Sequence, residues 1–134
     1  MVSSKNLQNE IDKIPFFRFL DLQIMECSDQ TTTCTMPAAE RIVGNPYFKN
    51  IHGGIIASFL EATASLTVFD RPVEGTPKPI NLTVNYLLPA KMKPLTCRAT
   101  IVRSGRRIAV VEAVAWQDDE EKPVAKGQFQ FLLV

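Results

Sequence analysis

The chain of 134 residues contains one histidine and three cysteines, and this scarcity excludes several classes of protein. Cys27, Cys34 and Cys97 form no C-x-x-C pair, so with a single histidine they offer too few ligands for a structural zinc site. An odd number of cysteines in apolar or strand-like segments indicates reduced thiols. We therefore expect no metal ion and a cytoplasmic location.

Strong charge of one sign and long hydrophobic runs are also missing. The 15 Lys and Arg residues nearly balance the 14 Asp and Glu residues, and no basic arm stands out, so we expect no nucleic-acid partner. No apolar run approaches the roughly 18 residues of a membrane-spanning helix, and the polar N-terminal segment 1–13 is unlike a signal peptide. The length predicts a single domain, residues 1–134, with its own core.

The order of the predicted elements is strands, one long helix and then more strands. The long helix is predicted over Gly53–Phe69, where apolar residues recur at helical spacing between alanines. After it, apolar and polar residues alternate, which is typical of half-buried strands. The other predicted elements are a short helix at 6–13, a loop at 37–51, and strands at 19–27, 31–36, 80–86, 96–103, 106–116 and 124–134. One apolar helix needs a sheet around it, which predicts an α+β domain with an antiparallel sheet.

Glu61 is the only formally charged residue between Asn50 and Phe69, in the middle of the predicted helix. Its helical neighbours at three and four residues are small and uncharged; they are Ala57, Ser58, Ala64 and Ser65. In such apolar surroundings the pKa of the carboxyl rises, which makes it a better base. Alternatively, Glu61 lies on a solvated edge of the helix, although such a face normally carries more than one charge.

His52, Gly53 and Gly54 open the same helix. Paired glycines let a ligand approach the backbone closely, and the first amides of a helix have no partner within it. Such N–H groups, with the helix dipole behind them, can polarise a carbonyl or hold an oxyanion. The alternative is local: the glycines permit a tight turn into the helix, and His52 caps or packs against it.

Together, the two features resemble the motif of hotdog-fold acyl-CoA thioesterases of the phenylacetate-pathway (PaaI) type. In that motif His-Gly-Gly precedes a carboxylate, and here Glu61 follows His52 by nine residues. His-Gly-Gly alone is a weak signal, but the resemblance extends over nearly the whole chain. It includes Gly44-Asn45-Pro46, the segment 85–90 (Asn-Tyr-Leu-Leu-Pro-Ala) and the segment 103–107 (Arg-Ser-Gly-Arg-Arg). The resemblance implies a hotdog fold, in which an antiparallel sheet wraps one long helix.

The resemblance also implies roles for four residues. Glu61 matches the catalytic carboxylate, which acts as a nucleophile or as a base for water. Gly53 matches the residue whose backbone N–H polarises the thioester carbonyl, and His52 matches the motif histidine that supports the loop. Asn45 resembles a loop Asn or Gln near the attacked carbonyl, in a loop whose length varies within the family.

One feature of the family is missing from the matching position. Some relatives use a hydroxyl from the partner subunit at the start of the strand after the helix, whereas the segment 78–81 reads Lys-Pro-Ile-Asn. Asn81, or Ser65 one turn beyond Glu61, is a possible substitute. For the acyl group, Ile55, Ile56 and Phe59 suggest an apolar contact surface.

A predicted hairpin concentrates basic residues around one turn. Its connection is expected at Ser104-Gly105, with Arg103, Arg106 and Arg107 on either side. Guanidinium groups and the free amides of a turn suit the phosphates of coenzyme A. The alternative is a solvated hairpin tip. Two lysines could widen the same patch; they are Lys91 and Lys93.

The sequence therefore predicts an acyl-CoA thioesterase that uses no metal or separate cofactor, since coenzyme A is part of the substrate. A lone sheet would leave an exposed edge, so we expect a homo-oligomer; the resemblance implies dimers, often paired into tetramers, with the active site at the interface. Two rivals are a hydratase or dehydratase on the same fold and a non-catalytic acyl-CoA-binding protein.

Overall fold

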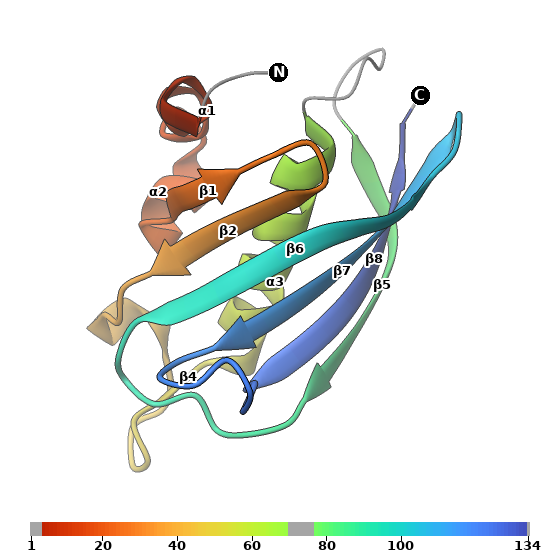
Figure 1. Cartoon of the computed structure of the whole chain (residues 1–134). Helices are drawn as coiled ribbons and strands as arrows, with labels where there is room; N and C mark the ends of the chain where they lie inside the picture. The colour runs from red at the N-terminus through yellow and green to blue at the C-terminus, as the bar shows by residue number, and fades with distance from the viewer. Residues whose placement is uncertain (1–3, 70–76, 134) are drawn as a thin grey trace.

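The computed structural model describes residues 4–69 and 77–133 of the chain. Within them, a six-stranded antiparallel sheet curves around one long helix, α3 (Gly53–Phe69), as Figure 1 shows. The strands lie in the order β1, β2, β6, β7, β8, β5. Their bounds are Gln23–Cys27 (β1), Thr31–Met36 (β2), Lys78–Tyr86 (β5), Leu95–Ser104 (β6), Ile108–Trp116 (β7) and Ala125–Leu132 (β8). The predicted α+β class is confirmed.

The core lies between α3 and the concave face of the sheet. Phe59 of α3 packs with Phe129 and Phe131 of β8, and none of the three exposes any surface. The strands at the centre of the sheet present fully buried alanines, which let α3 approach closely; they are Ala99, Ala109, Ala113 and Ala115. The predicted bounds of α3 are confirmed. In the described residues no helix has the length and hydropathy of a membrane span.

The first predicted strand is partly wrong, because its beginning is helical. The segment Pro15–Leu20 forms α2, and the strand starts only at Gln23. Pro15 occupies the first turn of α2, where a backbone N–H has no partner within the helix, so the missing N–H of proline costs nothing. Asp21 ends the helix in the left-handed conformation, with φ 53°. Pro15 therefore marks the start of a helix that the alternating pattern did not predict.

The N-terminal helix α1 (Ser4–Ile11) lies beside β1, at one edge of the sheet. Leu7 and Ile11 bury their side chains in the core. The Gln8 side chain binds the backbone at the start of β1: its Nε2 donates to the Leu22 carbonyl (3.0 Å), and its Oε1 accepts from Ile24 N–H (2.7 Å). These contacts hold α1 and α2 in a defined place next to α3.

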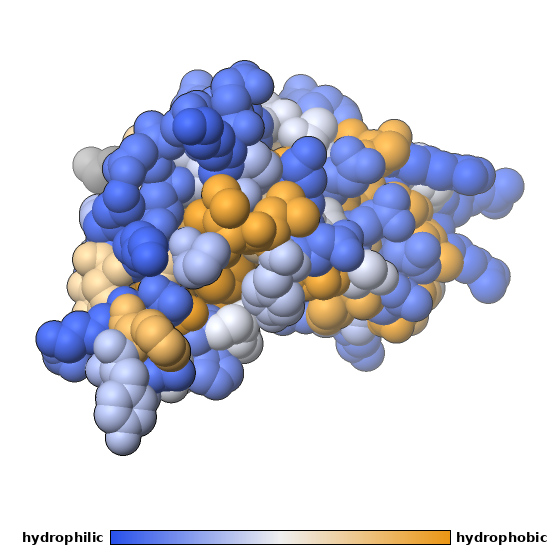
Figure 2. Space-filling view, turned by 90° about the horizontal axis from the view of Figure 1, so that it is seen from below, coloured by the Kyte–Doolittle hydropathy of each residue, from blue (hydrophilic) through white to orange (hydrophobic). Residues whose placement is uncertain are grey.

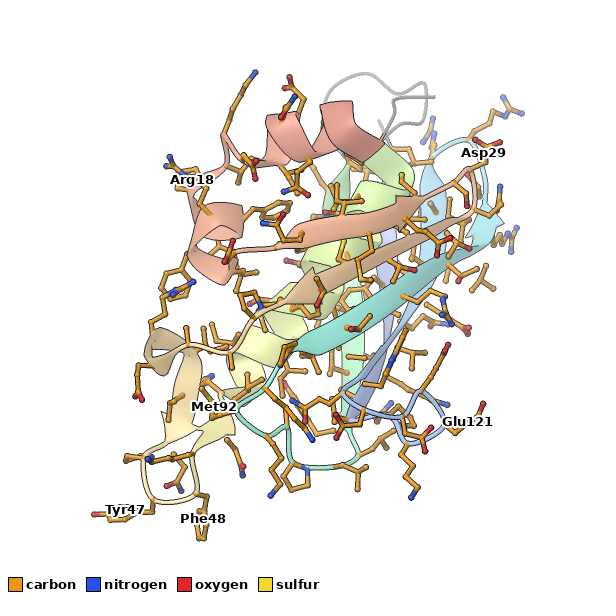
Figure 3. All side chains as sticks on the ribbon, turned by 60° about the vertical axis from the view of Figure 1, so that its left-hand side comes forward. Arg18, Asp29, Tyr47, Phe48, Met92 and Glu121 are labelled. Atoms are coloured by element: carbon orange, nitrogen blue, oxygen red, sulfur yellow. The ribbon has the colours of Figure 1, made fainter. Side chains whose placement is uncertain are left out.

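The predicted loop 37–51 contains short regular elements. They are the 3-10 helix η1 (Glu40–Ile42) and the two-stranded pair β3 (Val43–Asn45) and β4 (Asn50–Ile51). Figure 2 views the end of the molecule where α3 begins, and hydrophobic side chains gather there between hydrophilic ones. In Figure 3, Tyr47 and Phe48 lie at the tip of the β3–β4 connection and point away from the body of the chain, 91% and 73% exposed.

The edge strand β5 differs from its prediction in burial. Its alternating pattern does form a strand, and Leu82, Val84 and Tyr86 face the same side as the buried residues of β8. However, α3 does not cover this part of the sheet, so Leu82 is 46% and Tyr86 55% exposed. Within the described residues, Leu82 and Tyr86 therefore stay partly exposed, and the predicted burial of this face would need a further surface against it.

Candidate active site

Glu61 lies on α3 and lines a cavity of about 230 Å³. The walls come from α1, α2, α3 and the edge of the sheet formed by β5 and β8. No cation among the described residues forms an ion pair with Glu61. Partial burial raises the pKa of the Glu61 carboxyl, and loss of hydration is the cause. The structure thus favours a carboxylate in a partly dry cavity over one on a solvated face.

The space expected beside Glu61 is present. Ser58 and Ser65, one turn away on either side, line the same cavity. Their hydroxyls donate to the helix backbone, Ser58 to the Gly54 carbonyl (2.8 Å) and Ser65 to the Ala62 carbonyl (2.7 Å). The three residues expected to contact the acyl group do not line this cavity; they are Ile55, Ile56 and Phe59. Among them, Phe59 is fully buried in the core, because its side of α3 faces the sheet.

At the start of α3, the groups around the Gly53 amide are hydrogen-bonded, whereas the Gly53 N–H itself is not, within residues 4–69 and 77–133. His52 Nδ1 accepts from Gly54 N–H (2.9 Å), and the Tyr86 hydroxyl donates to the Gly53 carbonyl (2.8 Å). No acceptor for the Gly53 N–H exists among the described residues. Gly53 lines a second cavity, of about 330 Å³. Its amide is therefore available to a carbonyl oxygen.

Two residues of this second cavity were not predicted. Asn50 lines it, and its buried Oδ1 has no hydrogen-bond partner in the part of the chain that the structure describes. Tyr86 lines it from the end of β5 and holds Gly53 in place. The signal for Asn50 was its position two residues before His52, in the loop that leads into the helix. Tyr86 belongs to the segment 85–90 that resembles the family, but its contact with Gly53 was not predicted, because only the fold brings together two residues 33 positions apart.

Asn45 lies outside both cavities. Its Oδ1 accepts from the Tyr47 and Phe48 N–H groups, at 2.8 and 3.4 Å. These bonds close a turn at the end of β3, as asparagine side chains commonly do. Within one chain, the side chain of Asn45 therefore shapes the loop that carries the exposed aromatic residues.

Gly53 and Glu61 do not meet within one chain. They lie eight residues apart on α3, so the helix rise of 1.5 Å per residue separates them by about 12 Å. Each lines its own cavity, and the two cavities share no residue. Within one chain, the Gly53 amide and the Glu61 carboxylate therefore belong to separate cavities.

The basic hairpin has a longer connection than predicted. Strand β6 continues to Ser104 and β7 starts at Ile108, so three residues, 105–107, connect them. Gly105 N–H donates to the Ile108 carbonyl (2.8 Å), which closes the turn. Three exposed arginines surround it and form no ion pair within the described residues; they are Arg103, Arg106 and Arg107.

The hairpin lies at the end of the sheet opposite Gly53. Leu132 pairs with Ile108 on one side and with Lys78 on the other, so the hairpin adjoins the start of β5 (Figure 1). Gly53 instead contacts the last residue of β5. Lys91 bridges to Asn50 and therefore lies near Gly53, and Lys93 forms an ion pair with Asp118. The prediction that these two lysines widen the hairpin patch is therefore wrong.

One long helix in a curved antiparallel sheet is the arrangement of the hotdog fold, and the carboxylate on that helix and the amide at its start, which has no acceptor among the described residues, match the thioesterase motif. Residues 45–132 match the model of the family described as acyl-CoA thioesterase N-terminal domain. The chain therefore belongs to the acyl-CoA thioesterase family, as its motif predicted.

Individual relatives agree with this assignment. A protein of Saccharolobus solfataricus named as an esterase is 30% identical over 114 residues, which are 83% of this chain and 77% of that protein. The medium/long-chain acyl-CoA thioesterase YigI of Escherichia coli is 24% identical over 137 residues, covering 90% and 86% of the two chains. A solved thioesterase structure from Haemophilus influenzae superposes with a TM-score of 0.88 at 23% identity, covering 100% of this chain and 92% of that one, which confirms the fold.

Proposed function

We propose that this chain hydrolyses acyl-CoA thioesters to a free acid and coenzyme A. The observation that carries this proposal is the Glu61 carboxylate, which has no ion-pair partner in the described residues and whose pKa is raised by burial in an apolar cavity. Glu61 either takes a proton from an attacking water or attacks the thioester carbon itself, and the sulfur leaves with a proton as the thiol of coenzyme A. After direct attack, water hydrolyses the anhydride between the acyl group and Glu61, which releases the free acid. The Gly53 N–H stabilises the charge that develops on the carbonyl oxygen. Coenzyme A is part of the substrate, so no separate cofactor takes part.

The reaction is tested by following free thiol during incubation with a panel of acyl-CoAs. Hydrolysis releases one thiol per substrate. A hydratase would add water to a 2-enoyl-CoA without releasing thiol, and a binding protein would take up acyl-CoA without any reaction. Each rival therefore gives its own result, and binding without thiol release would contradict the proposal.

A second copy of the chain completes this active site. Because Gly53 and Glu61 are about 12 Å apart along one helix, we place the Gly53 amide of one copy beside the Glu61 carboxylate of the other. The edge strand β5 supports such an interface, since its outer backbone groups and its apolar face are uncovered. A symmetric dimer presents the same surface from both copies, so one interface forms two such sites.

We predict that the protein in solution has at least twice the chain mass of 15.0 kDa, and that Leu82→Glu disrupts the assembly. A charge on the uncovered face of β5 would be buried without a partner in the interface. Light scattering measures the mass. Met25→Glu, on the opposite edge strand β1, is the matched control, because Met25 is also an exposed apolar residue of an edge strand. An active monomer would contradict both the interface and the shared site.

We propose that the hairpin arginines bind the phosphates of coenzyme A. Arg106 and Arg107 are exposed beside the hydrogen-bonded turn, where two guanidinium groups can donate hydrogen bonds to one phosphate group. Replacing both with alanine is expected to raise KM for acyl-CoA roughly tenfold with little change in kcat. The difference in KM between the variant and the wild type should shrink at high salt, because salt also screens the attraction between the arginines and the phosphates in the wild type.

A short thioester without the nucleotide is the control substrate for this double variant, and its hydrolysis should hardly change. If hydrolysis of both substrates fell equally, the hairpin would support the fold or the interface instead. The phosphate site would then be sought at Lys91 and Lys93, of which Lys91 lies next to the cavity of Gly53.

We also propose a cytoplasmic location, which suits reduced cysteines. Cys34 and Cys97 lie directly opposite each other on β2 and β6, and both are free. Burial raises the pKa of the Cys34 thiol to about 12, so the reactive thiolate is suppressed.

A further inference from the structure

The cavity beside Glu61 is almost entirely apolar. It is lined by Phe16 and Phe17 of α2, by the preceding Ile14 and by Phe131 of β8. Ile14 and Phe16 stay 39% and 45% exposed although they are apolar. A ligand that covers such side chains removes apolar surface from water, which favours its binding.

The polar groups in this cavity are unsuited to a polar ligand. Apart from Glu61, the polar side chains that line it are Ser58 and Ser65. Both hydroxyls already donate to carbonyls of α3, at 2.8 and 2.7 Å. A hydroxyl or carboxylate far from the thioester would therefore lose its water and find no donor in exchange.

The wall formed by α2 is held in place from several sides. Arg41 Nε donates to the Phe19 carbonyl (2.7 Å), and the Arg41 guanidinium lies 5.5 Å from the Phe19 ring centre. Phe16 stacks on Phe19 with a centroid distance of 6.0 Å. Because Pro15 and the left-handed Asp21 also fix the two ends of α2, the helix limits the cavity as a rigid wall.

We propose that this cavity holds the acyl chain of the substrate, that it selects an unsubstituted apolar chain, and that Ile14 and Phe16 set the chain length. The inference rests on the proposed thioesterase activity and adds the substrate class to it. The thioester lies at the Glu61 end of the cavity, and the chain runs between α3 and α2 toward Ile14 and Phe16. These two residues lie outside the catalytic machinery and act as specificity determinants.

The test compares kcat/KM for straight-chain acyl-CoAs of increasing length and for counterparts with a hydroxyl at the far end of the chain. The wild type should prefer the unsubstituted chain roughly tenfold or more. Ile14→Ala with Phe16→Ala opens the wall and should shift the long-to-short ratio of kcat/KM roughly tenfold toward longer chains. Ile14→Trp narrows the cavity and should shift the ratio toward shorter chains. Met25→Ala, an exposed apolar residue on β1, should leave the ratio unchanged.

Binding of straight-chain 1-alkanols, measured by calorimetry, separates the two proposals, because it needs no turnover. Wild-type binding should strengthen with each methylene and should weaken for long alkanols in Ile14→Trp. If no acyl-CoA is hydrolysed but the alkanols behave in this way, the thioesterase proposal fails and the cavity assignment stands. If hydrolysis is normal but the Ile14 and Phe16 variants have the chain-length profile of Met25→Ala, the cavity assignment is overturned.

Discussion

Replacing Glu61 with glutamine is expected to lower kcat for acyl-CoA hydrolysis by roughly 10²–10⁴-fold. The amide has nearly the same shape as the carboxyl, but it can neither attack the thioester nor accept a proton from water. The fold and the assembly should stay intact, because Glu61 makes no ion pair within the described residues. Glu112→Gln is the matched control, because Glu112 is exposed on the outer face of β7. This variant should hydrolyse the substrate at the wild-type rate.

The pH dependence of the same reaction reports on Glu61. Only the ionised carboxyl is a nucleophile or base, so kcat should rise with pH and level off above the raised pKa of Glu61, which exceeds its ordinary value of 4.5. A raised pKa also means that the folded chain favours the neutral carboxyl. The stability that Glu61 contributes is thus fully present below pH 4.5 and is lost as pH rises through the raised pKa.

Thermal unfolding of Glu61→Gln therefore provides a second measurement. At neutral pH the variant should unfold at a slightly higher temperature than the wild type, and the difference should vanish in acid. Near wild-type turnover of this variant would remove Glu61 from the mechanism, whatever its effect on stability.

Replacing Gly53 with proline should lower kcat by roughly 10²–10³-fold, the usual effect of losing one oxyanion donor. Proline removes the amide hydrogen, yet it is well tolerated at the first position of a helix. Gly53→Ala is the matched control, because it keeps the N–H. Its added Cβ would lie 3.5 Å from the Tyr86 ring, an ordinary contact, so this variant should stay active.

Mixing the two inactive variants tests whether two copies share one site. If Gly53 of one copy serves Glu61 of the other, a mixed dimer of Gly53→Pro and Glu61→Gln contains one intact site and one doubly defective site. Refolding the variants together in equal amounts should then restore about a quarter of the wild-type activity. If both groups acted within one copy, no intact site could form, and activity would stay absent.

The catalytic helix and its motif could be predicted from the sequence because both depend on local spacing. Helical periodicity and alanine content determine Gly53–Phe69, and the lone charge of Glu61 stands out against them. The same holds for the pairing of His52 with Gly54, a contact between residues two apart. The sequence by itself also determined the strands that follow the helix to within about two residues, because their side-chain alternation is strict.

Only the tertiary structure decided how these parts combine, because contacts between distant segments leave no trace in local spacing. It revealed α2, which together with the preceding Ile14 forms a wall of the Glu61 cavity although both lie far from Glu61 in sequence. The structure also shows that much of β5 is exposed. The width of α3 determines how much of the sheet it covers, and the alternation of apolar and polar residues in β5 does not. The tertiary structure also assigns Gly53 and Glu61 to two cavities that share no residue, because the walls of each cavity come from segments that lie far apart in the sequence.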